Sequence, residues 1–99
     1  MSKWRTKDTD ELFEAILSLE NIEECYEFFE DACTIKEILD IAQRLKIAKM
    51  LKNGVNYATI SKETGVSTAT ISRVSKCIEY GNGGYNKAIE RAEKRKAND

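Results

Sequence analysis

Apolar residues recur at helical spacing through the first third of the chain. Short polar side chains can accept hydrogen bonds from the free N–H groups of a helix's first turn, so Asp8 or Thr9 is suited to cap a first helix and Asn21 a second. The i, i+3, i+4, i+7 pattern is typical of amphipathic helices. Residues 1–33 are therefore predicted to form two helices. Their apolar stripes comprise Leu12, Ile16 and Leu19 in the first and Ile22, Cys25, Tyr26 and Phe29 in the second.

The longest predicted helix covers residues 34–54. Thr34 is its expected N-cap, with Glu37 at the spacing of a capping box, and Gly54 is a typical residue to follow its end. Apolar positions extend over more than half of its circumference, whereas a helix on the surface of a core needs one stripe. Either its own neighbours surround it or a second subunit covers it, and in a chain of 99 residues we favour a second subunit. These positions are Ile35, Ile38, Leu39, Ala42, Leu45, Ile47, Ala48, Met50 and Leu51.

Residues 57–80 have the pattern of a helix-turn-helix. A short helix from Tyr57 to Thr64 is followed by Gly65, which can adopt the positive φ of a tight turn. Ser67 can then cap a second helix that ends near Tyr80. A hairpin that merely packs would show any of these features singly, but together, in this order, they favour a helix-turn-helix. The apolar seam between the two helices comprises Ile60, Val66, Ile71 and Val74.

A last helix is predicted over residues 85–97, after a glycine-rich run at 81–84. The chain has no Pro and only five Gly, too few for the many turns of a strand-rich fold. We therefore predict an all-α fold of about six helices that forms a single helical domain over residues 1–99.

The formal net charge of −1 hides an asymmetry between the two halves of the chain. Residues 1–40 carry 4 basic and 12 acidic side chains, a net of −8. Residues 41–99 carry 12 basic and 5 acidic side chains, a net of +7. Many of these charges solvate helix faces, but the second half alone is basic enough to attract phosphate.

The outer face of the second helix in the motif is small and polar, as in helices that enter a major groove. Hydroxyl groups can bond base edges or phosphates, an alanine methyl can contact a thymine methyl, and lysines suit phosphates. Ser61, on the first helix, is also small enough to let the two helices approach closely. We therefore predict double-stranded DNA as a partner. The predicted DNA-binding residues are Ser61, Lys62, Thr68, Ala69, Thr70, Ser72 and Lys76.

Other functional classes fit the composition less well. The chain has no His, and its three Cys lack any CxxC spacing, so we expect neither an enzyme nor a metal site. No signal peptide and no apolar run near the roughly 20 residues of a membrane span are found, which predicts a cytoplasmic protein with free thiols and no membrane partner. Two alternatives stay open: the DNA-binding subunit of a transposase or recombinase, and a helical adaptor that contacts a protein through its acidic half.

The run Ala69-Thr70-Ile71-Ser72-Arg73, together with Thr34, Arg44 and Gly54, resembles the Trp repressor superfamily, in particular its Trp-repressor-related branch of YerC/YecD type. The resemblance covers about two thirds of the chain and also includes Ile47 and Leu51. It implies an intertwined homodimer in which the helices of residues 1–33 wrap around the other subunit. It also implies a DNA-binding transcriptional regulator, most simply a repressor.

The resemblance further implies a corepressor site. In Trp repressor two arginines, which match Arg44 and Arg73, hold L-tryptophan, and a threonine matches Thr34. Here Val74 replaces a glycine that leaves room for the indole, and Cys77 replaces a serine that holds the amino group. We therefore expect no tight L-tryptophan binding and predict no certain cofactor. The arginines then serve another small-molecule corepressor, contact phosphate, or pair with carboxylates such as those of Glu37 and Asp40.

Overall fold

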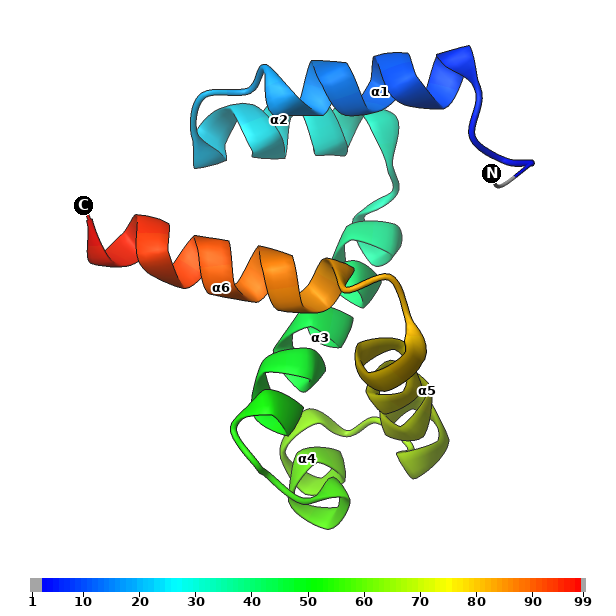
Figure 1. Ribbon diagram of the computed structural model, residues 1–99, viewed down its shortest axis with the longest axis vertical. Helices are drawn as coiled ribbons and strands as arrows, with labels where there is room; N and C mark the ends of the chain where they lie inside the picture. Colours follow the sequence, from blue (N-terminus) through cyan, green and yellow to red (C-terminus); the bar gives the residue numbers. More distant parts are fainter. Residues whose placement is uncertain (1–2, 99) are drawn as a thin grey trace. The chain divides into compact units, whose positions relative to one another are not determined.

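The computed structural model describes residues 3–98, and within them every regular element is a helix (Figure 1). The all-α prediction is confirmed. The elements are α1 (Lys7–Leu17), α2 (Ile22–Ala32), α3 (Ile35–Lys52), α4 (Tyr57–Thr64), α5 (Thr68–Tyr80) and α6 (Gly84–Ala97).

The contacts within the chain define two compact units, residues 1–38 and 39–99. The boundary falls inside α3, so this helix contributes its first turn to one unit and the rest of its length to the other. A single domain over residues 1–99 stays a prediction.

The helices of the first unit begin at side-chain caps. Thr6 caps α1: the Thr6 hydroxyl oxygen accepts from the Thr9 N–H (3.2 Å), and the Thr9 hydroxyl oxygen accepts from the Thr6 N–H (2.8 Å). The prediction that Asp8 or Thr9 is the cap was wrong. Two threonines three residues apart satisfy one free N–H each, so the helix begins at Lys7 and Thr9 lies in its first turn.

The other two predicted caps of this unit are confirmed. The Asn21 side chain accepts from the Glu24 N–H at 2.9 Å. Thr34 and Glu37 form the predicted reciprocal pair, with Glu37 N donating to Thr34 Oγ1 (3.1 Å) and Thr34 N donating to Glu37 Oε1 (2.8 Å). Local sequence therefore decides where these helices start.

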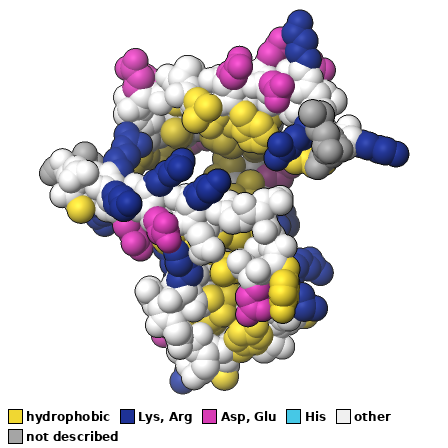
Figure 2. Space-filling model, in the orientation of Figure 1, with side chains coloured by type: hydrophobic (Ala, Val, Ile, Leu, Met, Phe, Trp, Pro, Cys, Tyr) yellow, Lys and Arg dark blue, Asp and Glu magenta, His cyan; other side chains and the backbone are white. Residues whose placement is uncertain are grey.

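The first unit has no buried core among its described helical residues. Neither α1 nor α2 contains a buried residue. Large apolar side chains lie at the surface instead: Leu17 is 83% exposed, Ile22 74% and Ile35 70%. Figure 2 shows such side chains, in yellow, open at the surface of these helices. Burial of apolar area is the main stabilising contribution to folding, so this unit lacks most of it within one chain.

The second unit has a core of its own, drawn from four helices. Its buried residues are Ile47 and Ala48 of α3, Ile60 of α4, Ile71 and Val74 of α5, and Ile89 of α6. Ile47, Ile60 and Ile71 have no exposed area at all. The side of α3 that carries Ile47 is therefore covered within the chain. Leu39 and Ile41, near the start of this unit, are 62% and 53% exposed.

Candidate nucleic-acid interface

The turn between α4 and α5 has the predicted geometry. Gly65 adopts φ +76°, a left-handed conformation that is strained for any residue with a side chain. Its N–H donates to Ser61 O at 2.8 Å. Ser67 caps α5 by accepting from the Thr70 N–H at 3.3 Å. Three residues thus separate the helices, as in a helix-turn-helix (Figure 1).

The predicted seam packs α4 against α5. Ile60 and Ile71 are fully buried, Val74 is 2% exposed and Val66 is half-buried. These side chains join the core of the second unit, and they fix which face of α5 points outward.

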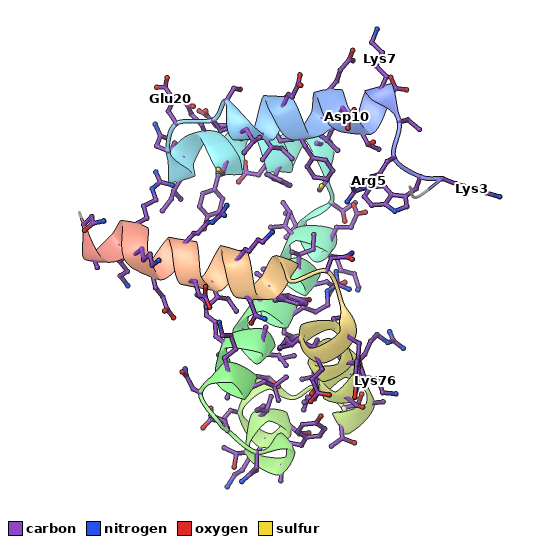
Figure 3. All side chains as sticks on the ribbon, in the orientation of Figure 1. Lys3, Arg5, Lys7, Asp10, Glu20 and Lys76 are labelled. Carbon is purple, nitrogen blue, oxygen red and sulfur yellow. The ribbon has the colours of Figure 1, made fainter. Side chains whose placement is uncertain are left out.

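The outward face of α5 carries predicted contact residues. Thr68, Ala69 and Lys76 are exposed and Ser72 is half-buried. Lys76 projects from α5 on the side away from α3 (Figure 3). On α4, Lys62 is exposed as well. The surface is therefore polar, small near the start of α5, and accessible to a DNA groove.

Two other predicted contact residues, Ser61 and Thr70, form hydrogen bonds within the protein. The Ser61 hydroxyl donates to Val66 O at 2.7 Å. The Thr70 hydroxyl lies 3.2 Å from the Ser67 hydroxyl, and Thr70 is half-buried. Both hydroxyl groups therefore already have a hydrogen-bond partner within the chain.

The basic charge of the second half lies mostly outside the motif. Residues 57–80 contain Lys62, Arg73 and Lys76 against Glu63 and Glu79, a net of only +1. Helix α6 carries five basic side chains, and Figure 2 shows dark-blue side chains gathered over it. The motif itself therefore offers few charged groups to a partner.

A pocket of about 260 Å³ brings Arg44 of α3 and Arg73 of α5 together. Between residues 3 and 98, neither arginine forms an ion pair with a carboxylate. The remaining residues that line it are Ile41, Thr70, Val74, Cys77 and Tyr85. Sequence reasoning missed Ile41 and Tyr85; the position of Tyr85 at the start of a helix that follows α5 was the available signal.

Thr34, the third residue of the predicted effector site, lies in the first unit. Its backbone N–H donates to the Glu37 carboxylate, and its hydroxyl oxygen accepts from the Glu37 N–H. Hydrogen bonds from the backbone and the side chain of Thr34 hold the pKa of the Glu37 carboxyl below its usual range. The bonds favour the ionised carboxylate because it is the better acceptor.

No candidate metal site and no candidate membrane-spanning helix are found among the described residues. No group of three or more His, Cys, Asp or Glu side chains is placed to hold a metal ion among residues 3–98. Within the same range, no helix has both the length and the apolar character needed to cross a membrane.

Fold and surface together define an all-helical protein with a helix-turn-helix. A family model described as Trp repressor protein matches residues 7–93. The protein YerC of Bacillus subtilis (strain 168), itself uncharacterised, is 55% identical over 91 residues, which cover 92% of this chain and 88% of YerC. This chain therefore belongs to the Trp repressor family, a family of DNA-binding regulators.

Solved structures agree in fold. The crystal structure of a proposed Trp repressor from Staphylococcus aureus superposes with a TM-score of 0.86 at 54% identity, covering 92% of this chain and 91% of that one. A TrpR-like protein from Eubacterium eligens ATCC 27750 gives a TM-score of 0.87 at 50% identity, covering 92% and 94%. The predicted Trp-repressor-like fold is confirmed.

Proposed function

We propose that this protein is a sequence-specific transcriptional regulator, and by its family a repressor, which inserts α5 into the major groove of DNA. The observation that carries the proposal is the exposed, small and polar start of α5, held outward by its buried Ile71 and Val74. A helix of this kind fits a groove about 12 Å wide.

We assign different roles to the predicted contact residues. Thr68, Ala69 and Ser72 read base edges, since a hydroxyl can donate or accept and the alanine methyl can contact thymine. Lys62 and Lys76 bind phosphates. Ser61 and Thr70 support these contacts by holding the turn and the start of α5, because their hydroxyls already bond within the protein.

The regulator acts as a cytoplasmic homodimer in this proposal. The support is the first unit, whose exposed apolar side chains and missing core are what a second copy would cover. Two α5 helices would then read half-sites about 34 Å apart, one turn of DNA.

Arg44 and Arg73 are proposed to bind a small anion in the pocket that they share. Two guanidinium groups without a carboxylate partner suit a carboxylate or phosphate group. L-Tryptophan is a poor candidate because Val74 and Cys77 line the space that its indole and amino groups would need.

Selection of binding sites from random duplex DNA, followed by gel shifts, tests the proposal. Ser72→Glu should reduce affinity at least 100-fold, because it places a carboxylate against the groove. Asn98→Glu, which adds the same charge far along the sequence from the motif, should change affinity less than twofold. Equal affinities for the two variants would show that α5 does not read DNA.

Salt dependence supplies a second readout. Each phosphate contact adds about 0.9 to the slope of log affinity against log salt. Lys76→Ala, which removes one contact per subunit, should therefore lower the slope of a dimer by about 2. No binding to duplex DNA at all would favour the adaptor alternative. A few palindromic chromosomal sites would favour a regulator over a recombination subunit.

A further inference from the structure

Three side chains hold the backbone of the turn between α4 and α5. The Ser61 hydroxyl donates to Val66 O at 2.7 Å. The Thr64 hydroxyl donates to Ile60 O at 2.7 Å and accepts from Val66 N at 3.3 Å. Gln43 Nε2 donates to Thr64 O at 3.4 Å, a longer contact that links α3 to the turn. We call Gln43, Ser61 and Thr64 the turn clamp.

The clamp acts on the residues that set the direction of α5. Val66 lies directly before the cap of α5, so both of its backbone polar groups are tied to α4. On the other side, Ile71 and Val74 anchor α5 in the core against Ile47 and Ile60. The helix is thus restrained at its start by hydrogen bonds and along its inner face by packing.

The buried polar side chains of this region need no additional partner. Among residues 3–98, no buried side-chain nitrogen or oxygen lacks a hydrogen bond. Val74 fills the inner wall of the Arg44–Arg73 pocket and is 2% exposed. A ligand in this pocket would therefore contact the exposed guanidinium groups of Arg44 and Arg73 and would not be needed to satisfy a buried polar group.

We infer that the turn clamp, with the core beneath it, positions α5 for DNA without a small-molecule corepressor. Gln43, Ser61 and Thr64 are positioning residues, since they act through the direction of α5. An anion bound between Arg44 and Arg73 adjusts DNA affinity but does not assemble the reading surface. The inference rests on the proposed DNA-binding function.

The first test uses amide hydrogen exchange on the full-length, extensively dialysed protein without DNA. The Gly65 and Val66 amides should be protected, and addition of L-tryptophan or inorganic phosphate should change their protection less than twofold. Thr64→Val keeps the shape but removes both hydroxyl bonds, so the Val66 amide should exchange about fivefold faster. Thr64→Ser, which retains a hydroxyl, should restore protection.

The second test measures affinity for the selected DNA site and for random DNA. Thr64→Val should weaken specific binding about fivefold and leave non-specific binding and the melting temperature of the core nearly unchanged. Gln43→Met should have a smaller effect, because its hydrogen bond is long.

The inference would be overturned if either added ligand increased the protection of the Gly65 and Val66 amides more than tenfold. It would also be overturned if the Thr64→Val protein exchanged these amides at the same rate as the native protein. Loss of DNA binding in the native protein, with these amides still protected, would instead overturn the proposed function. The two failures are therefore distinguishable.

Discussion

We expect Val74 to keep an indole out of the Arg44–Arg73 pocket. Its side chain is 2% exposed and belongs to the core, while its outer surface lines the Arg44–Arg73 pocket. An indole there would overlap this side chain, and overpacking of this kind costs about 1–3 kcal/mol. Cys77 is also a weaker hydrogen-bonding group than a hydroxyl for an ammonium group.

We therefore expect isothermal titration of L-tryptophan to show no binding tighter than about 0.1 mM, since each 1.4 kcal/mol is about a tenfold change. A dissociation constant in the low micromolar range would contradict this prediction. The double change Val74→Gly and Cys77→Ser is the positive control and should gain affinity. Its helicity must be checked, because glycine inside a helix costs about 1 kcal/mol and the lost isopropyl group leaves a cavity.

The reciprocal capping pair of Thr34 and Glu37 at the start of α3 predicts that the stability of this helix start depends on pH. The backbone and side-chain bonds to Thr34 lower the folded pKa of Glu37 below its unfolded value. The carboxylate therefore stabilises the first turn above its unfolded pKa, and this contribution is lost as the pH falls through the lower folded pKa. A carbon-13 NMR titration should place the pKa of Glu37 below that of a glutamate in an unfolded peptide.

The variant Thr34→Ala separates the backbone and side-chain hydrogen bonds that lower the Glu37 pKa. It removes the hydrogen bond from the Thr34 side chain and leaves the backbone donor, so the Glu37 pKa should rise only part of the way to its usual value. If the pKa of Glu37 in the native protein equals its value in the unfolded chain, the capping pair is not formed in solution.

The turn of the helix-turn-helix depends on one backbone conformation. A Cβ built on Gly65 meets no atom within 4 Å, so Gly65→Ala tests its positive φ alone. We expect urea unfolding to show a loss of about 1–2 kcal/mol. Gly84→Ala is the matched control, because its added Cβ also meets open space and its φ lies outside the positive range. Equal stabilities of the two variants would exclude strain at Gly65.

At the level of the whole molecule, the unequal burial of the two units predicts an obligate homodimer. Leu17, 83% exposed in the single chain, should lie in the interface, and Leu17→Glu should weaken dimerisation at least tenfold. Ala15→Glu places the same charge on an exposed position of the same helix and should have little effect. Sedimentation equilibrium measures both variants.

The unfolding temperature of the native protein should also rise with protein concentration, because folding and association are linked. A fully helical monomer at micromolar concentration would rule out the obligate dimer. In that case the exposed apolar side chains of α1 and α2 would need a different partner.

Local chemistry in the sequence was sufficient to determine the helices and most of their N-caps. The caps at Asn21, Thr34 and Ser67 and the turn at Gly65 were predicted correctly, because each depends on residues within three or four positions of one another. At the first helix, however, several neighbouring residues are chemically able to cap, and Thr6 rather than Asp8 or Thr9 is the cap.

Only the tertiary structure decided which apolar and polar side chains meet. Periodicity gave α3 a wide apolar surface, but packing against α4, α5 and α6 buries Ile47 and Ala48 and leaves Leu39 exposed. Likewise, the hydroxyl of Ser61 suited DNA in the sequence, yet the folded turn brings it to the Val66 carbonyl. Contacts such as Gln43 with Thr64 join residues 21 positions apart, and no local pattern specifies which distant backbone group a side chain will reach.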